Sequence, residues 1–169
     1  MKQVFETERI SFVKVSECLI NDYLTMVNDY ENVNRFLGTR NMTFTAEQEA
    51  EWVQSKLKEE APVFSMIEKS TGKFIGNTEL MNLKETEGEF GIAITAAMQD
   101  RGFGTEAVSA MIGYGMNGLG LTRIFLRADP ENARAIHVYE KCGYREYDRR
   151  DDHVYMEIYR QDHTTIKMP

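Results

Sequence analysis

Gln99-Asp100-Arg101-Gly102-Phe103-Gly104-Thr105-Glu106-Ala107 combines a glycine-rich turn with the start of a predicted helix. The two glycines around Phe103 permit backbone angles and close approaches that other residues resist. The first N–H groups of a helix lack partners inside the helix, and together with the positive end of the helix dipole they attract anions. The guanidinium group of Arg101 suits phosphate oxygens. We therefore predict that residues 99–104, called the glycine loop below, bind a pyrophosphate. A glycine-rich turn that binds nothing is the alternative for this stretch taken alone.

The residues before the glycine loop predict two helices followed by an antiparallel meander. Alternating apolar residues indicate a strand over 9–15, and helical spacing after Ser16 indicates a helix to about Asn28. Thr45 and Gln48 match a capping box at the start of a second helix, which ends before Pro62. Strands are then predicted over 63–68, 74–80 and 89–94, with turns between them.

The residues after the loop predict a helix, a strand over 122–128, a helix over 133–142 closed by Gly143, and a last pair of strands. The fold class that follows is α/β (α+β), with a mixed, largely antiparallel central sheet flanked by about four helices. A chain of 169 residues is expected to form one domain, with its core over about 8–161 and a polar tail over 162–169.

The amino-acid composition limits the kinds of partner that the chain is expected to bind and indicates its cellular compartment. The formal net charge of −7 argues against a nucleic-acid surface and weakly favours cationic or amine-bearing small molecules. The chain starts without a signal-peptide core, and no apolar run approaches the length of a membrane span. Cys18 and Cys142 form no metal or redox motif, so reduced thiols and a cytoplasmic location are expected. His153 and His163 have no partners at metal-ligand spacing, and no metal is predicted.

The glycine loop shares features with two nucleotide-binding motifs. A Walker A loop needs Gly-Lys-Ser/Thr, whereas Gly104 is followed by Thr105-Glu106. A dinucleotide fingerprint, G-x-G-x-x-A, fits residues 102–107, and Asp129 ends a later strand where a ribose-binding acid is expected. Residues 95–101 separate the preceding strand from the first glycine, which argues against this fingerprint. A dinucleotide-binding oxidoreductase that uses NAD(H) remains the runner-up.

Two segments resemble the GCN5-related N-acetyltransferases. Their hallmark, Gln/Arg-x-x-Gly-x-Gly/Ala at a strand-to-helix turn after the fourth strand, is matched by Gln99 to Gly104. The stretch NARAIHVYEKCGY over residues 132–144 is similar to the family segment Asn…Ala/Ser-Ile…Tyr-Glu-Lys-x-Gly-Phe. The order of elements agrees from about residue 8 to about residue 161. The N-terminal helical region with its capping box at Thr45 is most similar to the ribosomal-protein-alanine and polyamine acetyltransferase branches.

The resemblance implies acetyl-CoA as donor and a primary amine as acceptor, which attacks directly in a ternary complex. A protein N-terminus, a polyamine and a small-molecule amine remain open as acceptors, and residues 31–43 are expected to shape the acceptor pocket. The pantetheine arm is expected along the strand before the loop, and the pyrophosphate on the loop amides. A homodimer is also implied. The cofactor-binding residues that the resemblance implies are Ile92, Ala93, Ile94, Gln99, Arg101, Gly102, Phe103, Gly104, Thr105, Asn132, Ala135 and Tyr139. Asp100 departs from the family pattern and is expected to weaken cofactor binding.

The resemblance also implies catalytic residues. Tyr139 is the candidate acid that protonates the departing thiolate, and Glu79 and Glu89 are candidate bases that act on the amine through water. A non-catalytic acyl-CoA-binding module, in which Tyr139 only packs in the core, is the alternative from another functional class.

Overall fold

The computed structural model describes residues 1–38 and 42–163. Part of the predicted acceptor segment over 31–43 and most of the predicted tail over 162–169 lie outside the described residues. The chain forms two compact units, one made of Met1–Glu79 and Ile92–Phe103 and the other of Leu80–Gly91 and Gly104–Pro169. The single domain expected from the sequence stays a prediction.

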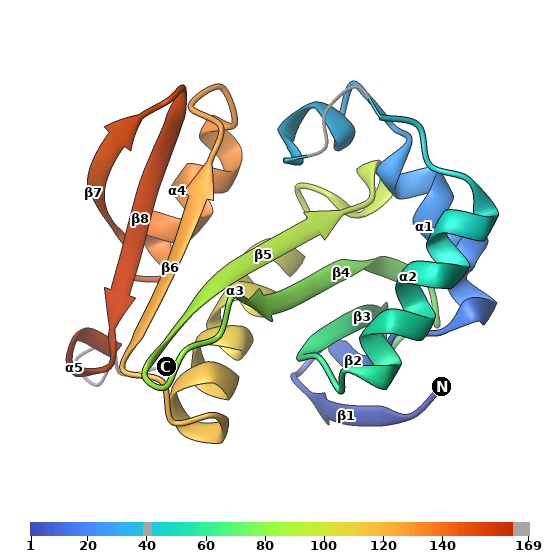
Figure 1. The fold of residues 1–169 in the computed structure, drawn as a ribbon, viewed down its shortest axis with the longest axis horizontal. Coiled ribbons are helices and arrows are strands. Elements are labelled where there is room, and N and C mark those ends of the chain that lie inside the picture. The colour runs from blue at the N-terminus through green and yellow to red at the C-terminus, as the bar shows by residue number, and fades with distance from the viewer. Residues whose placement is uncertain (39–41, 164–169) are drawn as a thin grey trace. The chain divides into compact units, whose positions relative to one another are not determined.

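The first unit is a sheet covered on one face by two helices, α1 and α2, which lie side by side (Figure 1). Its strands pair antiparallel from β1 to β4, and the last residues of β5 belong to the same unit. Its elements are β1 (Gln3–Glu6), β2 (Ile10–Lys14), α1 (Ile20–Val27), α2 (Ala46–Lys58), β3 (Val63–Glu68), β4 (Phe74–Met81) and the end of β5 (Glu87–Ile94), with short 3-10 helices at Glu17–Leu19, Asn34–Phe36 and Ala96–Met98.

Local sequence signals explain the helices of the first unit. The Thr45 hydroxyl accepts a hydrogen bond from the Gln48 amide at 3.3 Å, and the Gln48 side chain accepts one from the Thr45 amide at 2.9 Å, which completes the predicted capping box. Tyr23 of α1 is fully buried against the sheet, and its hydroxyl lies 2.6 Å from the Ser65 hydroxyl of β3. The core between helices and sheet also contains Val13, Leu19, Val53, Val63 and Phe74.

The second unit is a sheet with α3 and α4 on one face (Figure 1). β6 pairs in parallel with β5 from Glu87–Arg123 to Glu89–Phe125, and antiparallel with β8 over all six of its residues. Its elements are α3 (Phe103–Gly113, in this unit from Gly104), a π-helical turn (Tyr114–Gly118), β6 (Arg123–Ala128), α4 (Ala133–Lys141), β7 (Arg145–Arg150), β8 (His153–Tyr159) and α5 (Arg160–His163).

The described strands follow one hydrogen-bonded order, β1-β2-β3-β4-β5-β6-β8-β7, and most pairs are antiparallel. This confirms the predicted fold class. The structure adds β1, a four-residue strand at the edge of the sheet, and α5, a single short turn of helix. Both are too short to carry a detectable apolar period.

Candidate active site

The glycine loop has the backbone shape of an anion-binding turn. Asp100 and Gly102 have left-handed φ angles of 57° and 81°, and α3 begins directly afterwards at Phe103. Alternating backbone handedness brings successive N–H groups toward one side, an arrangement that binds anions. Asp and Asn tolerate the left-handed region better than most non-glycine residues, so the backbone conformation suits Asp100 even though its charge does not suit a phosphate.

Side chains hold this loop on the first unit. Gln99 Nε2 donates hydrogen bonds to the carbonyl oxygens of Ile94, at 2.8 Å, and Asn32, at 3.3 Å. Arg101 Nη2 lies 2.7 Å from Glu68 Oε1, a carboxylate that is only 6% exposed at the end of β3. The Arg101 guanidinium therefore already has a carboxylate partner, and the loop presents its main-chain amides as donors to an anion.

The residues expected to pair with a pantetheine arm lie in a strand, as predicted. Ile92, Ala93 and Ile94 end β5 and are partly exposed. Opposite them, a Cβ atom on Gly76 would lie 2.0 Å from the Ala93 carbonyl oxygen. Glycine at position 76 thus lets the main chain of β4 pass directly against this part of β5.

The N-cap and the first two turns of α4 carry three predicted site residues in the second unit. The Asn132 side chain caps α4 by accepting a hydrogen bond from the Ala135 amide at 3.3 Å. Ala135 and Tyr139 are four residues apart and so share one face of the helix. At the other end of α4, Cys142 Sγ lies 3.6 Å from the Thr105 carbonyl oxygen, which fixes α4 against the first turn of α3.

Tyr139 lies in a buried aromatic cluster, which we define as Phe90, Tyr139 and Tyr144. Its ring centroid is 6.2 Å from that of Phe90 and 6.0 Å from that of Tyr144, and the residue is 8% exposed. Burial, and to a smaller extent the nearby Cys142 thiol, raises the pKa of Tyr139 well above its ordinary value of 10. A phenol in this environment keeps its proton at neutral pH and gives it up less readily than an exposed tyrosine does.

The two candidate bases have different surroundings. Glu89 is 13% exposed, accepts a hydrogen bond from Asn82 Nδ2 at 2.7 Å and lies 3.5 Å from Arg127 Nε. Successive residues of a strand point to opposite faces, so Glu89 projects from the face opposite to Phe90, against which Tyr139 packs. In the first unit, Glu79 lies 3.8 Å from Lys56 Nζ of α2.

Sequence reasoning missed two residues that hold the loop, Arg9 and Glu68. Arg9 Nη1 donates a hydrogen bond to the Arg101 carbonyl oxygen at 2.9 Å, across 92 positions of sequence, and Glu68 is 33 positions from its partner. Local patterns carry no signal for such contacts. A burial argument could have found Glu68, because a buried acidic residue at the end of a largely apolar strand needs a partner.

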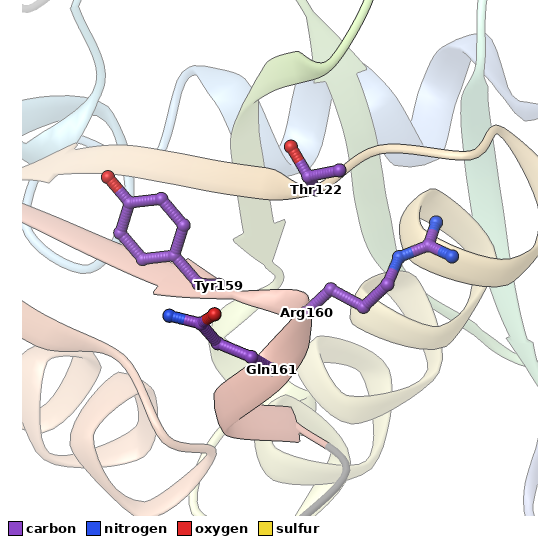
Figure 2. A pocket seen from close by; sticks show the side chains of 4 residues that line it. All are labelled: Thr122, Tyr159, Arg160 and Gln161. Carbon is purple, nitrogen blue, oxygen red and sulfur yellow. The ribbon is translucent and has the colours of Figure 1, made fainter.

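A hollow of about 390 Å³ in the second unit is lined by Thr122, Tyr159, Arg160 and Gln161 (Figure 2). None of these residues belongs to the predicted site. Within residues 1–38 and 42–163, no group of three or more His, Cys, Asp or Glu side chains could hold a metal ion. No helix in the same part of the chain is long and apolar enough to cross a membrane.

Comparison with known families decides the class of the protein. The model of the acetyltransferase (GNAT) domain matches residues 9–145, which is most of the chain. The chain belongs to the GNAT acetyltransferase family. This confirms the family predicted from the glycine loop and the segment over 132–144.

Curated and solved relatives agree with membership of the GNAT family. The spermidine N(1)-acetyltransferase of Escherichia coli K12 is 35% identical over 75 residues, a stretch that covers 43% of this chain and 40% of that protein. The match therefore spans less than half of that relative. A GNAT-family acetyltransferase from Bacillus anthracis has a TM-score of 0.82 at 21% identity, covering 92% of this chain and 98% of that one. A spermidine N-acetyltransferase from Vibrio cholerae, solved with CoA and spermine, has a TM-score of 0.78 at 19% identity, covering 94% and 99%. These two solved structures show that the fold is shared.

Proposed function

We propose that this GNAT domain is an N-acetyltransferase that moves an acetyl group from acetyl-CoA to a primary amine. The observation that carries the proposal is the glycine loop, whose left-handed residues Asp100 and Gly102 lead into the first turn of α3. Backbone amides at such a turn bind a pyrophosphate without any metal ion. The family membership and the solved relative that contains CoA support CoA as the pyrophosphate carrier.

Different site residues are proposed to bind different parts of the cofactor. The amides of Arg101, Gly102, Phe103, Gly104 and Thr105 would hold the pyrophosphate. The polar main chain of Ile92, Ala93 and Ile94 would pair with the pantetheine amides. Gln99 would fix the loop to the end of β5, as its hydrogen bond to Ile94 indicates. Asn132 and Ala135 would contact the pantetheine side and the thiol end from the start of α4.

The proposed chemistry is direct attack of a neutral amine on the thioester carbonyl carbon. The C–N bond forms, the C–S bond breaks, and CoA leaves as a thiolate that needs a proton. Tyr139, whose phenol carries a proton at neutral pH, would supply that proton as the C–S bond breaks. Glu89 or Glu79, acting through water, would remove the proton that the ammonium form of the acceptor carries. Positioning of the two substrates supplies most of the remaining rate.

A polyamine is the acceptor that we propose to test first. The curated relative with the matching stretch acts on spermidine, and the negative net charge of this chain attracts a polycation. The protein N-terminus and other small amines stay open as further acceptors. A cytoplasmic location and a homodimer are part of the same proposal. The free thiols of Cys18 and Cys142 support the location, since cytoplasmic thiols stay reduced.

Thermal unfolding with acetyl-CoA, CoA and NADH, each added separately, tests the cofactor class. A ligand that binds only the folded chain adds about 2.7 kcal/mol of stability at a hundredfold excess over its dissociation constant. We expect the midpoint to rise with acetyl-CoA and with CoA, and to stay unchanged with NADH. A rise with NADH alone would favour the dinucleotide-binding alternative and would contradict the proposal.

A further inference from the structure

Arg9 touches the glycine loop in several ways. Its Nη1 atom donates a hydrogen bond to the Arg101 carbonyl oxygen at 2.9 Å, and its guanidinium carbon lies 4.6 Å from the centroid of the Phe103 ring. Its Nη2 atom lies 3.1 Å from where a Cβ atom on Gly102 would be. Arg9 therefore lies against three consecutive residues of the loop, Arg101, Gly102 and Phe103.

The main chain of Arg9 is itself held in place. Its carbonyl oxygen accepts a hydrogen bond from the Lys69 amide at 2.9 Å, and the next residue, Ile10, pairs with Glu68 in the β2–β3 ladder. Glu68 binds the guanidinium group of Arg101 at 2.7 Å. Two side chains from this end of the β2–β3 ladder therefore hold Arg101. Arg9 donates a hydrogen bond to the Arg101 carbonyl oxygen, and Glu68 binds the Arg101 guanidinium group.

The contact to the Arg101 carbonyl orients an amide that the proposed function uses. The described chain contains no cis peptide bond, so the peptide that joins Arg101 to Gly102 is planar and trans. In such a peptide the C=O and N–H bonds point in opposite directions. When Arg9 holds the Arg101 carbonyl on one side, the Gly102 N–H must point to the other side, as a donor to the anion.

We propose that Arg9 is a positioning residue for the CoA pyrophosphate: it fixes the peptide plane between Arg101 and Gly102 and adds a positive charge beside the loop. This inference rests on the proposed function. The carboxylate of Glu68 neutralises the charge of Arg101, so that pair adds little net field at the loop. The Arg9 guanidinium also stacks on Phe103, the residue at which α3 begins, and this stacking favours one orientation of its fork.

The dissociation constant of CoA, measured by calorimetry on the full chain, tests this role. Arg9→Gln removes the positive charge and the planar set of guanidinium donors, whereas Arg9→Lys keeps only the positive charge. Lys14→Gln is the matched control, because Lys14 lies at the other end of β2, with its Nζ 5.8 Å from the centroid of the Phe64 ring. Loss of a hydrogen bond made by a charged donor, together with its charge, is expected to weaken CoA binding about tenfold or more in Arg9→Gln. We expect a smaller loss in Arg9→Lys and no change in Lys14→Gln.

The salt dependence of CoA binding separates this role from a purely structural one. The Arg9 charge lies across one peptide from the anion, well within a Debye length of about 8–10 Å, so CoA binding to Arg9→Gln should depend less steeply on ionic strength than binding to the unmodified chain. Suppose that the unmodified chain binds CoA tightly and that Arg9→Gln binds it with the same affinity and the same dependence on salt. That result would overturn this inference and leave the proposed function standing. If Arg9→Gln does not fold, equal affinity and salt slope in Arg9→Lys and the unmodified chain would overturn it as well. Failure of the unmodified chain to bind CoA would overturn both.

Discussion

Replacing Gly76 with alanine tests the close passage of β4 against β5. The new Cβ atom would lie 2.0 Å from the Ala93 carbonyl oxygen and 2.9 Å from the Ile94 Cα atom, whereas real Cβ contacts stay beyond 3.0 Å. Main-chain atoms cannot rotate away as a flexible side chain can, so the two strands must separate by about 1 Å. A shift of that size breaks main-chain hydrogen bonds between the two segments, such as the one that the Thr95 amide donates to the Ile75 carbonyl oxygen at 2.9 Å.

The expected cost follows from these two effects. Overpacking costs about 1–3 kcal/mol, and each lost hydrogen bond costs about 1 kcal/mol. We therefore expect Gly76→Ala to lower the free energy of unfolding by about 3 kcal/mol, which for a chain of this size lowers the melting midpoint by roughly 6–12 °C. Because the shift displaces Ala93 and Ile94, CoA affinity should fall in the same variant.

Two other glycines provide controls for urea unfolding monitored by circular dichroism. Gly72 has a φ of 71° and Gly113 lies in α3, and a Cβ atom on either would meet nothing within 4 Å. Gly72→Ala should cost about 1–2 kcal/mol through backbone strain alone. Gly113→Ala should stabilise the chain by about 0.5–1 kcal/mol. If Gly76→Ala unfolds no more easily than Gly72→Ala, the close-approach argument is wrong.

Four further substitutions test the site and the buried polar groups. Tyr139→Phe should lower kcat about 10²–10⁴-fold without changing the CoA dissociation constant, and an unchanged kcat would exclude the acid role. Glu89→Gln should lower kcat similarly, and if Glu79→Gln does so instead, Glu79 is the base. Tyr144→Phe removes a buried hydroxyl that has no hydrogen-bond partner in the described residues, and it should raise stability by about 1 kcal/mol; a loss in urea unfolding would contradict this.

Glu49 of α2 should make the stability of the chain depend on pH. Burial raises the pKa of this carboxyl above its ordinary value of 4.5, so the folded chain binds the proton more tightly than the unfolded chain. Its contribution to stability is therefore full below about pH 4.5 and is lost as the pH rises. Glu49→Gln should raise the melting midpoint at pH 7, and the gain should shrink near pH 4. An equal gain at both pH values would show that the carboxyl charge is not the cause.

The sequence predicted well those features that depend on neighbouring residues. The capping box of Thr45 and Gln48 formed as expected, because both partners lie within one helical turn. The glycine loop also formed a turn before a helix, because Gly102 supplies the left-handed angle within the motif itself. The remaining features of the fold class followed from the resemblance to the family, in its two motifs and in the order of its elements.

Features that depend on strand register could not be predicted in this way. The partner of Arg101 is Glu68, and that pairing arises only because β3 ends, and β2 begins, beside the loop. The need for glycine at position 76 likewise follows from the approach of Ala93, a residue on another strand. Nothing in the local sequence around Arg9 indicates that its side chain reaches residue 101. Each of these contacts joins segments that the chain brings together only after the sheet has formed.

The most direct test of the proposed acetyl transfer is to mix the purified chain with acetyl-CoA and spermidine and follow thiol release and product mass together. We predict that CoA thiol and spermidine carrying one acetyl group appear in equal amounts, at a rate that saturates with acetyl-CoA. The proposal would be contradicted if the chain binds CoA but modifies neither spermidine nor any of a panel of other primary amines. In that case thiol release would not exceed the rate measured without protein. The non-catalytic acyl-CoA-binding module would then be the correct description.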